Sequence, residues 1–128
     1  MLFLSAALSL IAQDPVTDLG LIEVRGQRLH PIVRVQVNAD APLEAMVIGT
    51  PSSIRCGAER FAYDRYMQPR QCWIRRAPGT ELSLQAVAPA DWGDSWRVEW
   101  QDCPTPSGRT CQLTATRADQ TIKANFIR

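Results

Sequence analysis

Apolar and polar residues alternate along five short segments of the chain, which is the period-two pattern of half-buried β-strands, and a sixth, more apolar segment at 44–49 follows the first of them as its expected hairpin partner. In residues 81–87, for example, Leu82, Leu84 and Ala86 share one face. Turn-forming residues separate the segments at close spacing, and we expect no room for the repeated helical crossovers of a parallel sheet. The pattern therefore predicts a small antiparallel sheet with strands at 32–37, 44–49, 81–87, 96–100, 111–115 and 121–126.

Two local features refine this picture. Residues 38–42 carry Asn, Asp and Pro, so we expect a turn that joins 32–37 and 44–49 as a hairpin. Residues 58–67 contain neither Gly nor Pro and place aromatic and charged residues at helical spacing, which predicts two to three turns of helix ended by Pro69. The expected fold class is mainly β (α+β), with one short helix.

The first residues of the chain indicate its location, and its net charge limits its partners. Residues 1–12 carry no charged side chain and are too few to span a bilayer, so they fit the apolar core of a signal peptide. We expect a flexible leader at 13–30 and a single domain at 31–128, with no membrane-spanning segment. The formal net charge of +1 gives no large field to attract nucleic acid, which is not an expected partner.

Four cysteines lie in the predicted domain, and an even number behind an export-like leader indicates two disulfides in a periplasmic or secreted protein. The gaps between them are fifteen, thirty and seven residues, unlike the close pairs of a structural zinc site, so no metal or cofactor is expected. Four cysteines allow three connectivities. Pairing of sequence neighbours, Cys56 with Cys72 and Cys103 with Cys111, is favoured because short loops close at low entropic cost.

Several short motifs follow one another in a recognisable order. They are I-x-C-G at 54–57, G-T-x-L-x-L-x-A at 79–86, Trp100 three residues before Cys103, C-x-L-x-A at 111–115 and T-I-x-A-N-F at 121–126. This order resembles the divergent InlB B-repeat, a bacterial surface-repeat module. The resemblance implies a β-grasp-like fold with a sheet packed across a short helix, and an extracytoplasmic location as a spacer or adhesive module.

The resemblance carries structural positions but no catalytic residues. It implies that Cys56, Cys72, Cys103 and Cys111 are disulfide partners and that Trp100 and Phe126 lie in the core. The chain departs from the family pattern in two ways. It holds one copy rather than an array, and it has fifteen residues between its first two cysteines where relatives have only a few. Residues 57–71 are therefore interpreted as an insertion.

The insertion is the expected binding surface, because aromatic residues and arginine are enriched at interface hot spots. A disulfide-closed loop is also partly ordered before binding. The alternative is that Phe61 and Tyr66 seal the core and that Trp92 folds over a sheet edge. The predicted contact residues are Arg60, Phe61, Tyr63, Arg65, Tyr66 and Arg70, joined by Trp92 on a turn.

Candidate catalytic residues are sparse. His30 is the only histidine and stands next to Pro31, where we expect a surface position rather than the base of a nucleophile. Carboxylate pairs serve glycoside hydrolysis, but only in a cleft, so we expect the acidic group to be solvated. That group consists of Asp91, Asp94, Glu99 and Asp102.

These observations predict a non-catalytic exported β domain that binds a protein or a cell-envelope component. Two alternatives stay open. One is a purely structural or spacer module with no dedicated ligand. The other is a small envelope hydrolase that uses the loop carboxylates.

Overall fold

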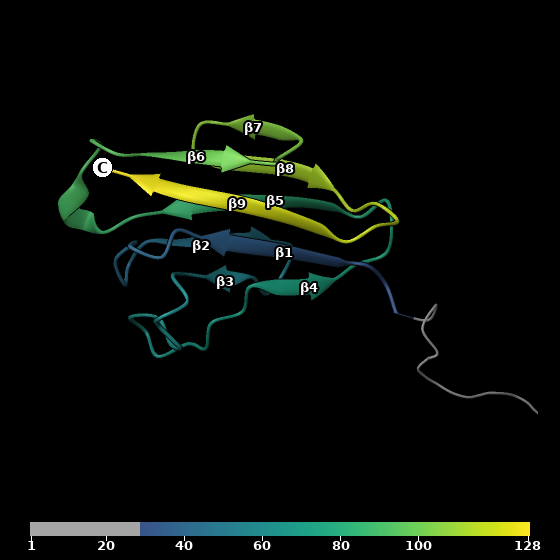
Figure 1. The fold of residues 1–128 in the computed structure, drawn as a ribbon, viewed down its shortest axis with the longest axis horizontal. Helices are drawn as coiled ribbons and strands as arrows, with labels where there is room; N and C mark the ends of the chain where they lie inside the picture. Colours follow the sequence, from purple (N-terminus) through teal and green to yellow (C-terminus); the bar gives the residue numbers. More distant parts are fainter. Residues whose placement is uncertain (1–28) are drawn as a thin grey trace, which may run out of the picture. The chain divides into compact units, whose positions relative to one another are not determined.

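The computed structural model describes residues 29–128, of which Pro31–Arg128 form one compact unit. The predicted signal peptide and all but the last two residues of the leader lie outside the described residues. Within Pro31–Arg128 the chain forms nine strands in two sheets (Figure 1). They are β1 (Ile32–Val37), β2 (Met46–Thr50), β3 (Arg55–Cys56), β4 (Trp73–Arg75), β5 (Glu81–Val87), β6 (Arg97–Gln101), β7 (Thr105–Ser107), β8 (Thr110–Thr114) and β9 (Gln120–Ile127).

The first sheet has the strand order β4-β1-β9-β6, and the second sheet has the order β3-β2-β5-β8-β7. The last strand of the chain, β9, therefore lies inside the first sheet, antiparallel to β6 and parallel to β1. All other pairs between these nine strands are antiparallel. The parallel pair needs no helical crossover, because the seven intervening strands connect its members.

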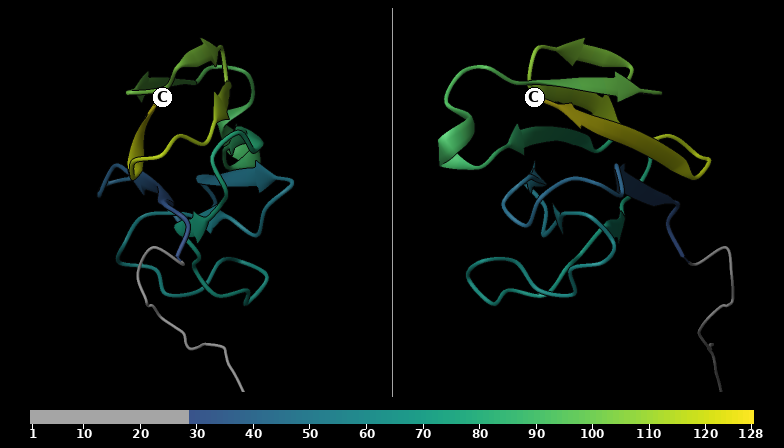
Figure 2. Two further views of the ribbon diagram at one scale, coloured as in Figure 1. Left: turned by 90° about the vertical axis from the view of Figure 1, so that its right-hand side faces the viewer. Right: turned by 60° about the vertical axis from the view of Figure 1, so that its left-hand side comes forward.

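The core lies between the inner faces of the two sheets, which form the two layers visible in Figure 2. Leu82, Leu84 and Ala86 share the inner face of β5 as predicted. The same alternation places Ile122, Ala124 and Phe126 of β9 on the inner face of the first sheet. Residues from both layers belong to one buried cluster, as expected of a two-layer β domain.

The mainly β fold and both favoured disulfides are confirmed. Cys56–Cys72 and Cys103–Cys111 have Cα–Cα distances of 4.7 and 6.0 Å. The Cys56–Cys72 bond links the two sheets, because Cys56 lies on β3 of the second sheet and Cys72 directly precedes β4 of the first. Cys103 lies in the connection from β6 of the first sheet to β7 of the second, and its bond ties that connection to Cys111 on β8.

The predicted hairpin of 32–37 and 44–49 is wrong, because β1 and β2 belong to different sheets. The connection between them crosses the end of the core, where Ala41 and Ala45 are almost fully buried. Small side chains at these two positions let the backbone pass closely from one layer to the other. The strands predicted at 111–115 and 121–126 are likewise β8 and β9 of separate sheets.

The helix predicted at 58–67 is also wrong, since these residues form turns and an isolated bridge between Tyr63 and Pro69. The helical element of the described residues is a single 3-10 turn, η2 (Ala90–Trp92). The two layers are thus both sheets, rather than a sheet and a helix. Three short strands, β3, β4 and β7, are too brief to show an alternating pattern in the sequence.

The side chain of Asn38 extends the pairing of β1 with β9. Its Oδ1 accepts a hydrogen bond from the Phe126 N–H at 2.7 Å, and its Nδ2 donates to the Phe126 carbonyl at 3.4 Å. The Asn38 N–H itself donates to the Ala124 carbonyl at 3.3 Å. The side-chain amide therefore replaces a backbone peptide group at the end of the strand, as Asn commonly does in turns.

Candidate functional site

Residues 57–71 form a loop that is closed at its base by the Cys56–Cys72 disulfide. Next to the disulfide, Arg55 and Gln71 exchange two backbone hydrogen bonds, both of 2.9 Å. Further out, the Arg70 N–H donates to the Ala62 carbonyl at 2.9 Å. The two halves of the loop therefore run antiparallel to each other and form a small hairpin rather than an irregular open loop.

Asp64 organises the turn at the end of this hairpin and is the one buried charged residue of the described chain. Its Oδ1 accepts hydrogen bonds from the N–H groups of Tyr66 at 2.8 Å and Gln68 at 2.9 Å. Its Oδ2 accepts two from the Arg55 guanidinium, at 3.0 Å from Nε and 2.5 Å from the terminal nitrogen. These side-chain to backbone bonds compete with a helix and account for its absence here.

The surroundings of Asp64 act on its pKa in opposite directions. Burial by itself raises the pKa, because it disfavours the charged carboxylate. The hydrogen bonds from Arg55 and from the N–H groups of Gln68 and Tyr66 outweigh burial and hold the pKa of Asp64 below its ordinary value. The carboxylate is therefore ionised at neutral pH and fixed to both the turn and β3.

Three of the predicted contact residues anchor the loop to the domain. The Arg60 guanidinium donates to the carbonyls of Ala39 and Ala41, the latter at 2.8 Å, and lies 4.4 Å from the ring centroid of Phe61. Phe61 is half-buried and packs against the core. Arg70 donates from Nε to the Gly57 carbonyl at 3.2 Å. These contacts involve the domain's own backbone and core.

The remaining predicted contact residues of the loop are exposed. The exposed fraction is 53% for Tyr63 and 65% for Tyr66, and it reaches 72% for the neighbouring Met67, which sequence reasoning missed. Arg65 forms an ion pair with Glu44 at 2.8 Å and lies 5.1 Å from the Tyr66 ring centroid. We name Tyr63, Arg65, Tyr66 and Met67 the loop tip.

Met67 has a backbone φ of +62°, a conformation that glycine and asparagine adopt more readily than methionine. The hydrogen bond from its N–H to the Asp64 carbonyl, 3.0 Å long, belongs to this turn. A large apolar residue directly before the Gln68-Pro69 pair was the signal available in the sequence. Its exposure could not be deduced from a pattern that predicted a helix.

Trp92 lies apart from the loop tip, on the η2 turn beside the end of β9 (Figures 1 and 2). It is half-buried, packs against the core, and lies 6.4 Å from Trp96 between ring centroids. Trp96 in turn stacks on Phe126 at 5.9 Å and has the Arg109 guanidinium 3.7 Å from its ring centroid. The structure thus does not bring Trp92 together with the predicted contact residues of 57–71.

The candidate catalytic side chains are exposed. His30 has a surface position, as predicted, and Asp91, Asp94, Glu99 and Asp102 are all exposed. Glu99 forms an ion pair with Arg97 at 3.3 Å. Within residues 29–128, no group of three or more His, Cys, Asp or Glu side chains is placed to hold a metal ion.

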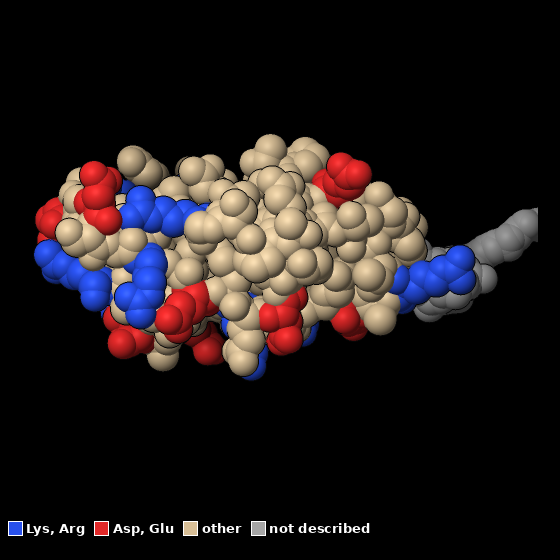
Figure 3. Space-filling model, turned by 90° about the horizontal axis from the view of Figure 1, so that it is seen from above, with Lys and Arg blue, Asp and Glu red and all other residues tan. Residues whose placement is uncertain are grey.

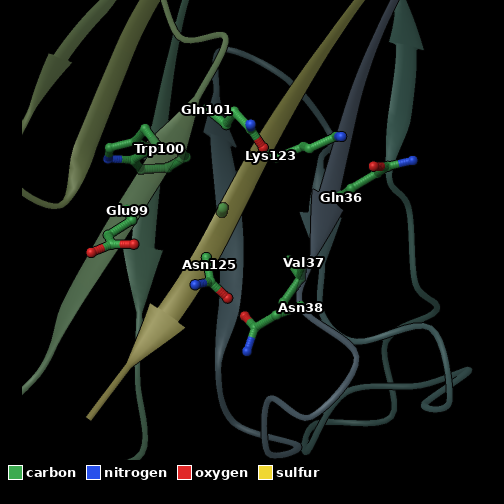
Figure 4. A pocket seen from close by; sticks show the side chains of 9 residues that line it. Gln36, Val37, Asn38, Glu99, Trp100, Gln101, Lys123 and Asn125 are labelled. Atoms are coloured by element: carbon green, nitrogen blue, oxygen red, sulfur yellow. The ribbon is translucent and has the colours of Figure 1, made fainter.

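The outer face of the first sheet carries a hollow of about 510 Å³. Figure 4 shows Gln101, Lys123 and Gln36 in one line across β6, β9 and β1, and Glu99, Asn125 and Asn38 in a second line. Sequence reasoning did not select these residues, except Glu99, because exposed polar residues on alternating strands look like ordinary solvated positions.

Charges of both signs are interspersed on the face that Figure 3 presents. They gather at the end near the C-terminus and along one long edge, while the surface over β7 is uncharged. This face therefore presents no single-sign patch of the kind that binds nucleic acid electrostatically. Among residues 29–128 no helix is long and apolar enough to cross a membrane.

Comparisons of the chain with protein-family models, with curated proteins and with solved structures find no match.

Proposed function

We propose that this chain is a non-catalytic exported domain that binds a protein, or another component of the cell envelope, through its loop tip. The observation that carries the proposal is the exposure of Tyr63, Tyr66 and Met67 on a loop whose backbone is held in place. Tyr, Met and Arg are enriched at the centres of protein interfaces, where buried aromatic side chains supply much of the binding energy.

The anchoring of the loop favours binding energetically. Association has to offset the lost freedom of any segment that becomes ordered in the complex. Here the disulfide, the Arg55–Asp64 pair and the bonds of Arg60 and Arg70 already fix the backbone. Only the exposed side chains of the loop tip would lose freedom, so more of the gain from burying them would remain as affinity.

Three observations support export as part of the proposal. The structure holds two disulfides, which persist in oxidising compartments. The apolar residues 1–12 are typical of a signal peptide. The motif order resembles the InlB B-repeat, an extracytoplasmic module.

A second candidate function is a structural module with no dedicated ligand. It is favoured by the two disulfides that cross-link the domain and by the use of Arg60, Phe61 and Arg70 to hold the loop on the domain. In that case the exposed loop tip would have no partner. The two functions differ in what happens when the side chains of the loop tip are removed. A binding domain would lose its partner, whereas a structural module would lose no interaction with another molecule.

Crosslinking capture from native envelope extract tests the proposal. We compare the whole wild-type chain with a variant carrying Tyr63→Ser, Tyr66→Ser and Met67→Asn, in which Asn suits the positive φ of residue 67. The matched control carries Gln85→Ala and Thr114→Ala, two exposed positions on the outer face of the second sheet. Thermal unfolding of all three proteins checks that each is folded.

We expect wild type and the control to capture the same partner. The amount of that partner captured by the folded tip variant should be lower by tenfold or more. Purified partner should then show the same loss in a direct binding measurement. Identical captures by all three folded proteins would overturn the proposal and favour the structural module.

A further inference from the structure

A second hollow, of about 330 Å³, adjoins the first one on the outer face of the first sheet. Gln36 and Val37 line both hollows, so the two are neighbours, and we name them together the outer groove. At one end lie Glu99 and Gln101 of β6, and at the other lies Trp73 of β4. The groove therefore crosses all four strands of the sheet.

Strand register places the groove residues in rows across the sheet. Gln101 pairs with Lys123, which pairs with Gln36, and Glu99 pairs with Asn125. Arg34 pairs with Trp73 at the β4 end. Three strand spacings of about 4.8 Å give a length of about 14 Å, which suits a short chain molecule better than a single small ring.

The polar side chains of the groove are available to a ligand. Within residues 29–128, the side chains of Gln36, Gln101, Lys123 and Asn125 make no hydrogen bond or ion pair, and all four are exposed. Figure 4 shows them projecting from the same side of the sheet. At the β4 end the Trp73 side chain is 45% exposed and has the Arg75 guanidinium 5.8 Å from its ring centroid.

We propose that the outer groove binds a largely uncharged saccharide chain. Side-chain amides offer both donors and acceptors, which matches the hydroxyl groups of a sugar. An exposed indole ring can stack on the apolar face of a sugar ring while its polar edge stays in water. Arg34, Arg70 and Lys123 are nearly balanced by Glu59 and Glu99 along the groove, so its charge does not demand an ionic ligand.

The groove favours a saccharide over a polypeptide through its unbonded side-chain amides rather than through its overall composition. It holds Trp73 and Arg34, which are of kinds enriched at protein interface centres, but also Lys123 and Glu99, which are of kinds depleted there. Strand addition by a peptide requires a free sheet edge, and this surface is the face of a sheet. The loop tip is a separate surface, so the saccharide site is independent of the proposed function and the two can succeed or fail separately.

Titration of the isotope-labelled whole chain with soluble oligosaccharides, followed by NMR, tests the proposal. The probes are oligomers derived from cellulose, chitin and mannan, with a galacturonate oligomer as the anionic comparison and an unstructured polar peptide as the polypeptide comparison. The side-chain amide signals of Gln36, Gln101 and Asn125 and the indole signal of Trp73 report on the groove. Gln85, on the outer face of the second sheet, reports on non-specific effects.

We expect at least one neutral probe to shift the groove signals saturably and to leave Gln85 unchanged. Trp73→Ala, and separately Gln36→Ala with Gln101→Ala, should weaken that binding about tenfold, the effect of losing one stacking or bidentate contact of ordinary strength. Gln85→Ala should leave it unchanged. The loop-tip variant should also bind the saccharide normally, which distinguishes this site from the proposed function.

Several results would overturn the saccharide proposal. One is the absence of saturable groove shifts with every neutral probe. Another is binding that survives both sets of groove substitutions. Binding of the galacturonate oligomer or the peptide alone would assign the groove to another ligand class.

Discussion

Among single residues, Asp64 decides the local structure of the loop at 57–71. It joins Arg55 on β3 to the N–H groups of Tyr66 and Gln68 in the turn of the loop. Spacing alone predicted a helix through this position, because sequence periodicity does not show whether a carboxylate will bond to its own backbone. The presence of Arg55 beside it, contributed by a strand, decides in favour of the turn.

The lowered pKa of Asp64 predicts acid sensitivity. Since the folded pKa lies below the unfolded value of about 3.9, ionised Asp64 stabilises the fold above about pH 4, and this contribution is lost as the pH falls through the folded pKa. Asp64→Asn keeps one acceptor oxygen but loses the ion pair. The variant should have a lower Tm than wild type at neutral pH. This difference in Tm should become smaller as the pH falls below about 4.

Asp91→Asn is the matched control, because Asp91 is exposed on the η2 turn. It should follow the wild-type Tm at every pH. A constant gap in Tm between wild type and Asp64→Asn down to the lowest measurable pH would contradict the assignment of acid sensitivity to Asp64.

Among the structural elements, the loop at 57–71 has two groups of side chains. One group holds the loop on the domain, and the other is exposed to solvent. Arg60, Phe61 and Arg70 face the domain, while the loop tip faces solvent. Composition identified the group as a whole, since aromatic residues and arginine recur through it. Composition could not show which of these residues face the domain and which face solvent, because that depends on the side of the small hairpin that each residue occupies.

Phe61 and Tyr66 should differ in their effect on stability. Phe61→Ala removes a ring that packs on the core and under Arg60, so it should lower the free energy of unfolding by about 2 kcal/mol, less than for a fully buried ring. Tyr66→Ala should change it by less than about 0.5 kcal/mol, as exposed substitutions do. Denaturant unfolding at neutral pH measures both, and equal losses would show that the exposed ring also packs.

Across the whole domain, the two disulfides act as cross-links at separate places. Cys56–Cys72 joins the sheets where β3 and β4 lie, and Cys103–Cys111 ties the connection from β6 of the first sheet to β7 of the second onto β8. Both sheets are small, and the connection from β1 to β2 passes between them without a hairpin. Cross-links at two places hold the layers over one core.

Removing each bond should destabilise the domain by an amount set by its loop. The bonds close loops of 16 and 8 residues in sequence separation. Paired Cys→Ala substitutions should cost about 3 kcal/mol for Cys56–Cys72 and about 2.5 kcal/mol for Cys103–Cys111, since the longer loop restricts the unfolded chain more.

Chemical denaturation with and without reductant measures these losses, and a thiol assay of the protein from its native compartment should find no free cysteine. Losses from the two bonds should be nearly additive because they join different parts of the sheets. An unchanged denaturation midpoint after removal of either pair would contradict their role as cross-links.

Features that depend on local pattern could be predicted from the amino-acid sequence. Alternation placed Leu82, Leu84 and Ala86 inside, and the short gaps between cysteines favoured the observed pairs. These features follow from neighbouring residues, because side chains alternate across any strand and short loops close at low cost.

Strand pairing and the set of side chains exposed on the loop follow only from the three-dimensional fold. The parallel pairing of β1 with β9 brings together residues 87 positions apart, and no local pattern predicts it. The outer groove depends on that pairing, since Gln36 and Lys123 meet only across it. Alternation predicts which side chains point outward. The partner strand determines which of these outward side chains become neighbours, and therefore what surface they form.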